Sequence, residues 1–468
     1  MATPTATPTS LLGGGVRVEG RKVTIERAES LRSDAMDAMV RDAVFGDEAG
    51  REHARWLVWE IAQAAGVHPW SINDLYLARG RGETHGFTVP AINVRAMTYD
   101  TARSIFRTAI KMEVGAFILE IARSEIAYTD QRPAEYVTVV LAAALREGFR
   151  GPVFIQGDHF QVSAKKFAAD PKTEVDAVKA LAKEAIAAGF YNIDVDTSTL
   201  VDLSKASLEE QQRANYETGA DIAAFIRDNE PSGVTISIGG EIGEVGTQNS
   251  TPSELIAYMD GFDAALARRS PRNTEGLSKI SVQSGTSHGG VVLADGSIAD
   301  VKLDLETLRA LSVLAREKYG MAGAVQHGAS TLPDSAFHAF PHSETAEIHL
   351  ATNFQNMLFD HLPGALRQEI YEWLRANAKD ERKASDSDEQ FFYKTRKKAI
   401  GPFKTKIWDL PEDSRQALAD AYDAKFEFLF SQLAVGGTRD IVSRFIRPAV
   451  LHHTGSGAAA PDDAELSD

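Results

Sequence analysis

Three histidines each follow a short apolar run of the sequence and could together hold a metal ion. His159 lies at the end of "GPVFIQGDHF", His288 lies in "GTSHGG" and His327 lies in "QHGAST". The chain contains no cysteine, so a transition metal would have to be bound by His, Asp or Glu. A lone histidine in such a place is more often a hydrogen-bonded structural residue, but three neutral imidazoles at one site match a catalytic zinc with one open position. Nickel or cobalt would accept similar ligands.

Carboxylates stand at the ends of the neighbouring apolar runs. Asp158 directly precedes His159, the run "NIDVD" ends in Asp196, and Glu241 and Glu244 follow "TISIGG". A general acid or base must lie within hydrogen-bond reach of the proton that it moves. A carboxylate next to a metal ligand in the chain meets that condition for a substrate bound at the metal.

Small residues surround two of the histidines, in "GTSHGG" and in "QHGAS". Such loops let backbone N–H groups approach an anion closely, as in phosphate-binding nests. A glycine-rich turn between a strand and a helix, without any ligand, is the alternative interpretation. For "HGAS" the sequence leaves both interpretations open.

These residues need a scaffold, and the chain from residue 86 onwards predicts one. Short β-branched apolar runs alternate with amphipathic segments of helical length, and only the gap before the last run is too short for more than one turn of helix. The eight runs lie in residues 86–94, 114–122, 151–160, 190–198, 233–244, 277–290, 323–331 and 345–353. Eight such units over about 270 residues predict an α/β fold of the (β/α)8 TIM barrel type. A doubly wound open sheet is the alternative, but no turn carries its GxGxxG fingerprint. In a barrel, the carboxyl ends of the strands would bring the polar residues to one rim.

Outside the barrel, the sequence predicts tails and helices. We expect a disordered tail and a helical extension over residues 1–85, the barrel over 86–360, a helical appendage over 361–455 and a disordered tail over 456–468. The net charge of −16 argues against general binding to nucleic acid or to anionic membranes, and no apolar run reaches membrane-spanning length. We therefore expect a cytoplasmic protein, and the apolar appendage favours a homo-oligomer, either a dimer or a tetramer.

The appendage also carries a basic cluster, which consists of Lys394, Arg396, Lys397, Lys398 and Lys404. A cluster of this kind is more often a solvated helix face. It could instead reach a neighbouring site and bind an anion there.

Five motifs, in chain order and at predicted strand ends, resemble those of the class II, metal-dependent ketose-bisphosphate aldolases: "VPAINV", "GDHF", "GTSHGG", "KLD" and "QHGAS". That family includes the fructose-bisphosphate and tagatose-bisphosphate aldolases, and the resemblance covers about residues 86–355. It implies a (β/α)8 barrel with zinc (Zn2+) held by three histidines, which by motif are His159, His288 and His327. The implied activity is reversible aldol cleavage of a ketose phosphate, such as fructose 1,6-bisphosphate, to dihydroxyacetone phosphate and an aldehyde.

The resemblance also suggests roles for the other site residues. Asp158 resembles the catalytic aspartate, while Glu241, in "EIG", and Asp196 resemble acids close to the metal. Glu244 is the nearest candidate for the acid that moves the carbon-bound proton. The positions that match or replace substrate-binding groups are Asn93, Gly289, Gly328, Ser330, His349 and Thr352.

The sequence departs from the family pattern on the substrate side. The segment "GGVVLADG" lacks the lysine that usually follows the sixth-strand histidine, and in "IHLATN" His349 and Ala351 replace two polar groups. Glu120 and Ala122 stand where the family has a glutamine and a serine. These changes leave the three histidines intact, so they concern the identity of the substrate more than the metal.

Aldol cleavage must stabilise an enediolate, which a zinc ion can do as a Lewis acid. Asp158 would then exchange the hydroxyl proton, and Glu244, or alternatively Glu241, would move the carbon-bound proton. Two other functions stay open. One is a non-catalytic accessory subunit of a tagatose-bisphosphate aldolase-type system, against which the intact histidines argue. The other is a metal-dependent sugar-phosphate isomerase or epimerase, which also needs an enediolate.

Overall fold

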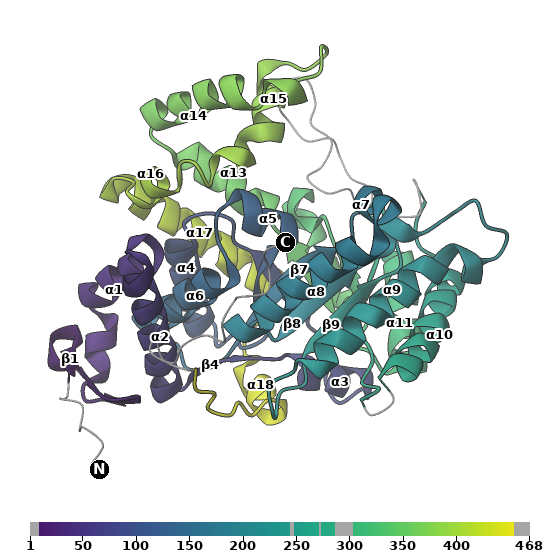
Figure 1. Cartoon of the computed structure of the whole chain (residues 1–468), viewed down its shortest axis with the longest axis horizontal. Helices are drawn as coiled ribbons and strands as arrows, with labels where there is room; N and C mark the ends of the chain where they lie inside the picture. The colour runs from purple at the N-terminus through teal and green to yellow at the C-terminus, as the bar shows by residue number, and fades with distance from the viewer. Residues whose placement is uncertain (1–8, 244–247, 271–272, 286–302, 454–468) are drawn as a thin grey trace.

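Eight parallel strands close into a barrel in the computed structural model, which describes residues 9–243, 248–270, 273–285 and 303–453 (Figure 1). The strands are β5 (Val89–Asn93), β6 (Ile118–Ala122), β7 (Gly151–Gln161), β8 (Asn192–Asp196), β9 (Ser237–Glu241), β10 (Lys279–Val282), β11 (Ala324–Gln326) and β12 (Glu347–Leu350). Each strand pairs with the next, and β12 pairs with β5 to close the ring. Most strands are buried along their whole length, which explains why their sequences read as nearly continuous apolar runs. The predicted (β/α)8 barrel is confirmed, with all eight predicted runs as its strands.

Helices on the outside connect the strands. The long ones between β5 and β11 are α4 (Thr98–Lys111), α6 (Pro133–Glu147), α8 (Pro171–Ala188), α9 (Leu208–Asp228), α10 (Pro252–Arg269) and α11 (Leu305–Tyr319). Capping boxes at Ser207 and Thr251 begin α9 and α10. The short helices α5 (Arg123–Tyr128) and α7 (Ala164–Ala169) follow β6 and β7 at the carboxyl ends of the strands. Between β11 and β12 only short turns and α12 (Ala339–His342) occur, as the sequence predicts.

The N-terminal extension is more ordered than the sequence suggests. Thr9–Leu11, in the region where we expect the disordered N-terminal tail, form strand β1 of a small antiparallel sheet with β2 (Val16–Glu19) and β3 (Lys22–Ile25). The predicted helices follow as α1 (Asp34–Phe45), α2 (Glu48–Ala65) and α3 (Asn73–Gly80). A further strand, β4 (Val67–Trp70), pairs in parallel with the first residues of β7, whereas β8 pairs with the later ones. The extension is therefore joined to the barrel by backbone hydrogen bonds.

Helices after the barrel pack back onto it. After α13 (Thr352–His361) come α14 (Gly364–Asn377), α15 (Asp388–Thr395), α16 (Lys404–Trp408), α17 (Glu412–Gln432) and α18 (Arg439–Phe445). In Figure 1, α14 and α15 lie beyond α5 and α13, while α17 lies beside α4. Arg107 of α4 pairs with Asp423 of α17 at 2.9 Å. Among the described residues, no helix is long and apolar enough to cross a membrane.

The last described residues return to the N-terminal extension. The indole N–H of Trp59, in α2, donates to the backbone oxygen of Leu451 at 2.6 Å. The ring of His453 stacks on Trp59 with ring centroids 3.6 Å apart. Nδ1 of His452 lies 2.6 Å from Oε2 of Glu60. The last described residues of the chain thus pack on α2.

Candidate active site

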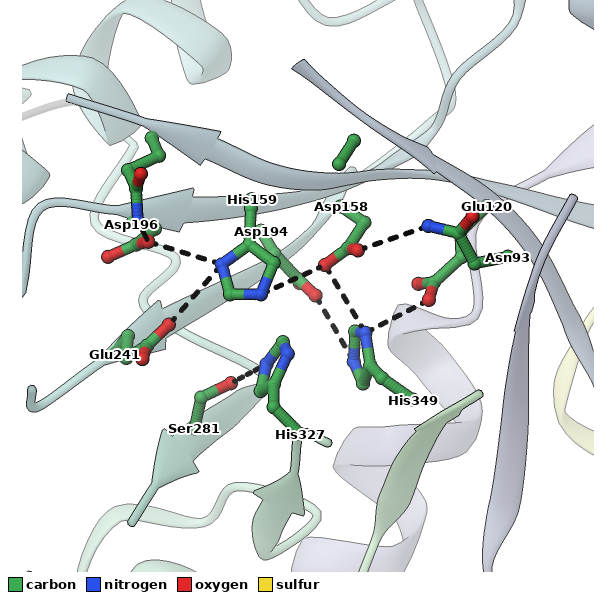
Figure 2. A network of polar contacts seen from close by, with 12 residues as sticks. Asn93, Glu120, Asp158, His159, Asp194, Asp196, Glu241, Ser281, His327 and His349 are labelled. Atoms are coloured by element: carbon green, nitrogen blue, oxygen red, sulfur yellow. Dashed lines mark hydrogen bonds and ion pairs between the residues drawn. The ribbon is translucent and has the colours of Figure 1, made fainter. Parts of the chain in front are cut away.

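The carboxyl ends of the barrel strands bring most of the predicted site residues together (Figure 2). Figure 2 shows side chains from β5 to β12 that face one another across the barrel: Asn93, Glu120, Asp158, His159, Asp194, Asp196, Glu241, Ser281, His327 and His349. Gly328, Ser330 and Thr352 line the same cavity. The remaining predicted residues, Glu244, His288 and Gly289, lie outside the described residues.

An irregularity in β7 places two consecutive side chains in the site. Neighbouring residues of a regular strand point to opposite faces, yet Asp158 and His159 both line the cavity. The pairing of β7 with β8 shifts register between Gly157 and Phe160, and His159 has a φ of 40°. Gly157 permits this bend because a Cβ there would lie 2.5 Å from the ring of Phe160.

Carboxylates surround the imidazole of His159. Its Nδ1 lies 3.1 Å from Oδ2 of Asp196 and 3.7 Å from Oε2 of Glu241. Its Nε2 lies 3.7 Å from Oδ1 of Asp158. Burial lowers the pKa of His159, but the three carboxylates outweigh burial and raise this pKa well above its usual value. A divalent cation would supply the positive charge that these carboxylates otherwise obtain from a proton.

The two acids beside His159 differ in protonation. Burial and the charge of Asp196 raise the pKa of Glu241 to about 8, so Glu241 retains a proton at neutral pH. Burial also acts on Asp196, but hydrogen bonds from His159 and Ser198 outweigh it and lower the pKa of Asp196. The ionised Asp196 orients His159 through Nδ1, which leaves Nε2 for a ligand in the cavity.

His327 completes the described part of the candidate metal-binding set. Its ring centroid lies 4.3 Å from that of His159, and its Nε2 lies 2.9 Å from Oγ of Ser281. Ligand atoms of Asp158, His159 and His327 all lie within 4.8 Å of one another. Two imidazoles and a carboxylate at this spacing fit a divalent transition metal such as zinc. A second group, His159, Asp196 and Glu241, meets the same spacing.

Asn93 lies on the side of Asp158 away from His159. Its Nδ2 donates to Oε2 of Glu125 at 2.6 Å and lies 3.4 Å from Oδ2 of Asp158. Glu125 in turn pairs with Arg95 at 2.7 Å. Strand β5 and helix α5 thus fix the second oxygen of the carboxylate.

A buried ionic network lies below the site, and most of it does not follow from sequence motifs. Lys279 of β10, 1% exposed, pairs with Asp194 at 2.9 Å and also with Glu347. Nε2 of His349 lies 2.8 Å from Oε1 of Glu347, and Nδ1 of His349 lies 3.1 Å from Oε1 of Glu120. One sequence feature could have indicated this network: a charged residue within an otherwise apolar strand, as in "ILEIA", "KISV" and "EIHL".

The cavity above these residues has a volume of about 690 Å³ and a cationic outer wall. The basic residues that line it are Arg95, Arg123, Lys166 and Lys397. Arg95 and Arg123 pair with Glu125 and Glu174, respectively. The cavity is therefore suited to a polar, anionic ligand.

Lys397 comes from the turn Arg396–Ala399, within the basic cluster of the appendage. Lys394, Lys398 and Lys404 pair with carboxylates, and the guanidinium of Arg396 lies over the rings of Phe359 and Tyr393. Within the described ranges, Lys397 has no carboxylate within 4 Å, and its Nζ lies over the ring of Tyr128 in α5. The cluster is thus a solvated face only in part, because one of its members reaches the cavity.

Comparisons with known proteins agree with this arrangement. Residues 80–406 match the family described as fructose-bisphosphate aldolase class-II. Among solved structures, a probable tagatose 6 phosphate kinase from Sinorhizobium meliloti 1021 is 17% identical over 76% of this chain and 99% of that chain, with a TM-score of 0.53. The fructuronate-tagaturonate epimerase UxaE from Cohnella laeviribosi is 10% identical over 75% of this chain and 82% of that chain, with a TM-score of 0.51. The fructose-bisphosphate aldolase from Campylobacter jejuni is 18% identical over 80% of this chain and 97% of that chain, with a TM-score of 0.46.

At these identities, the likeness to solved structures establishes the fold alone. A comparison with curated protein sequences finds no match. The family match spans well over half of the chain and includes every described site residue. Class II aldolases are in general metal-dependent, in keeping with the donor set at His159 and His327. The protein belongs to the class II fructose-bisphosphate aldolase family.

Proposed function

We propose that the protein catalyses the reversible aldol cleavage of a phosphorylated ketose, such as fructose 1,6-bisphosphate, to dihydroxyacetone phosphate and an aldehyde. The carrying observation is that Asp158, His159 and His327 present ligand atoms within 4.8 Å of one another on the floor of one cavity. Cleavage of a β-hydroxy ketone needs an electrophile at the ketone and a base at the hydroxyl. A metal held by the imidazoles would be the electrophile, and the neighbouring carboxylate of Asp158 would be the base.

Zinc is the proposed metal, with His159, His288 and His327 as its ligands. When bound, it supplies a Lewis acid that stabilises negative charge on the ketone oxygen. Asp196 orients His159 through Nδ1, and Ser281 contacts Nε2 of His327 at 2.9 Å. Glu241 stands on the outer side of His159 as a further oxygen donor for the cation.

Asp158 is the proposed base for the hydroxyl group at the bond that breaks. Its carboxylate lies beside His159 and is approached by Asn93, which fixes its orientation. In the cleavage direction it accepts the hydroxyl proton, and a second acid must then protonate the carbon of the ketone fragment. Glu244 is the proposed second acid. Glu241 is the alternative, because its pKa of about 8 keeps a proton available near neutral pH.

The phosphorylated end of the substrate is assigned to the loops after β10 and β11. Gly289, Gly328, Ser330 and Thr352 are the proposed contacts there, and His349 is a proposed contact to substrate hydroxyl groups. Gly328 has a φ of 69°, which opens its backbone to a ligand. Lys397 and Arg123 support an anionic group at the opposite end of the substrate, since both line the outer wall of the cavity.

The test is a cleavage assay of the zinc-loaded protein against a panel of ketose mono- and bisphosphates, with released dihydroxyacetone phosphate measured by a coupled reduction. We expect turnover of at least one compound and loss of that turnover in Asp158→Asn. A protein that binds zinc but cleaves nothing in the panel would refute the proposal.

A keto-sugar epimerase is the second candidate. The observation in its favour is a second acid–base pair, Glu120 and His349, in the same cavity as Asp158. An epimerase must remove and return a proton at one carbon, which two such groups can share. Proton NMR of the same panel in deuterated water separates the functions, since epimerisation changes the configuration of the sugar without producing an aldehyde.

A further inference from the structure

Four buried carboxylates surround His349, which lies in the floor of the cavity. They are Glu120, Asp158, Asp194 and Glu347, each at most 5% exposed. Each has an oxygen within 4 Å of a ring nitrogen of His349, which is itself 5% exposed. So many negative charges cannot stay ionised in a barrel interior without cations close by.

One half of this cluster has its cation. Nζ of Lys279 lies 2.9 Å from Asp194 and also pairs with Glu347, while the hydroxyl of Tyr76 donates to Glu347. The two carboxylates share the single positive charge of Lys279, and the neutral hydroxyl of Tyr76 adds a hydrogen bond to Glu347. This half of the network therefore has a lysine as its counter-ion.

Around Glu120, the basic side chain that the described residues supply is the imidazole of His349. Oε2 of Glu120 accepts a hydrogen bond from Gln156 at 2.9 Å, but within the described part of the chain no lysine or arginine lies within 4 Å of Glu120. Its Oε1 makes no hydrogen bond of acceptable geometry to a described residue, and the same holds for both ring nitrogens of His349.

The spacing of these atoms is that of ligands around one ion. Nδ1 of His349 lies 3.1 Å from Oε1 of Glu120 and 3.3 Å from Oδ1 of Asp158. Ligands bound tetrahedrally at 2.0–2.1 Å lie roughly 3.3 Å apart. A nitrogen and an oxygen at this distance without hydrogen-bond alignment match two ligands of a shared cation better than a hydrogen-bonded pair.

We propose that Glu120, Asp158 and His349 bind a second divalent cation, separate from the ion at His159 and His327. One imidazole and two carboxylates suit manganese or zinc. Asp158 lies next to both sites, because its carboxylate is placed between His159 and His349 (Figure 2). The second ion fixes this carboxylate from below and compensates Glu120. The proposal takes the first ion from the function proposed above, but it does not depend on the substrate.

The experiment counts metal ions per chain. The full-length protein is stripped with a chelator, reloaded with an excess of manganese or zinc, desalted and measured by elemental analysis. We expect two ions per chain in the wild type and one in Glu120→Gln and in His349→Asn. His327→Asn should also retain one ion, and the double variant with His349→Asn should retain none.

Tyr76→Phe is the matched control, because it removes a buried hydrogen bond from the same network without removing a candidate ligand. It should bind two ions. If a His349 variant does not fold, the wild-type count and the isosteric Glu120→Gln still decide the proposal. A wild-type protein that saturates at one ion, or variants that keep two, would overturn it. Either result leaves the cleavage assay as an independent test of the proposed function.

Discussion

Asp158 and His159 are consecutive in the chain, and both of their side chains point into one cavity, with Oδ1 of the aspartate 3.7 Å from Nε2 of the histidine. A regular strand would send one of them to the outside of the barrel. The register shift in β7 and the φ of 40° at His159 bring a proposed metal ligand and a proposed base to the same substrate. This pairing makes the roles of the two residues separable by mutation.

Asp158→Asn should lower kcat by about 10²–10⁴-fold, because the amide cannot accept the hydroxyl proton. The ion on His159 and His327 should remain, so elemental analysis should still find at least one zinc per chain. Turnover within tenfold of the wild type would contradict the role of Asp158.

His327→Ala and His288→Ala should each remove the catalytic ion, because both variants lose an imidazole ligand. Elemental analysis after desalting measures this directly. His338→Ala is the control, since His338 is exposed and lies outside the cavity, and it should keep its metal and its turnover.

Lys397→Met should raise KM for a phosphorylated substrate by about tenfold, as expected for loss of a charge-assisted contact. The value of kcat should change little if the lysine binds the substrate away from the reacting atoms. The neighbouring Lys398 pairs with Glu381, so Lys398→Met should leave KM as it is. Equal effects of the two substitutions would show that general surface charge, and not the position of Lys397, is responsible.

Lys279→Met should lower the free energy of unfolding by about 3–5 kcal/mol, because Asp194 and Glu347 would remain buried without their cation. Denaturant unfolding of the metal-free protein measures this loss. Lys318→Met removes an exposed pair with Asp260 and should cost far less, because solvent screens that pair. A loss of similar size in both variants would contradict the importance of the buried network.

Acid should detach the end of the chain from α2. Burial lowers the pKa of His453 to about 4, below its usual 6.5, so the stacked form is stable above pH 6.5 and weakens as the pH falls towards 4. The shift corresponds to at most about 3 kcal/mol. Hydrogen exchange of residues 446–453 should therefore be faster at pH 5 than at pH 7.5, after correction for intrinsic rates. His453→Phe keeps an aromatic ring against Trp59, so its protection should not depend on pH in this range.

The barrel could be predicted from the sequence because its strands are buried on both sides and read as separate apolar runs. The gathering of Asp158, His159, Asp196, Glu241 and His327 follows from that topology, since carboxyl ends of parallel strands share one rim. The strand β4 could not be predicted in this way. Its sequence "VHPW" is short and contains a proline, and its only evidence is the pairing with β7.

The buried charges were harder still to predict. Lys279 lies in "KISV" and contacts Asp194 and Glu347, which are 85 and 68 residues away in the chain. Nothing local distinguishes such a lysine from one that ends a strand in solvent. The position of the Lys397 side chain likewise depends on how the turn Arg396–Ala399 packs against α5. It also depends on which of the neighbouring basic residues form ion pairs, and the sequence specifies neither.

Lys397 lies in a different part of the chain from the residues proposed for metal binding and proton transfer. The proposed metal ligands and acids that the structure describes lie in the barrel strands or directly after them, whereas Lys397 belongs to a segment that follows the barrel in the chain. Under the proposed function, we expect changes in residues 364–410 to alter which sugar is accepted while the barrel strands keep their sequence. In such an architecture, substrate choice can evolve in a part of the sequence that carries none of the proposed chemistry.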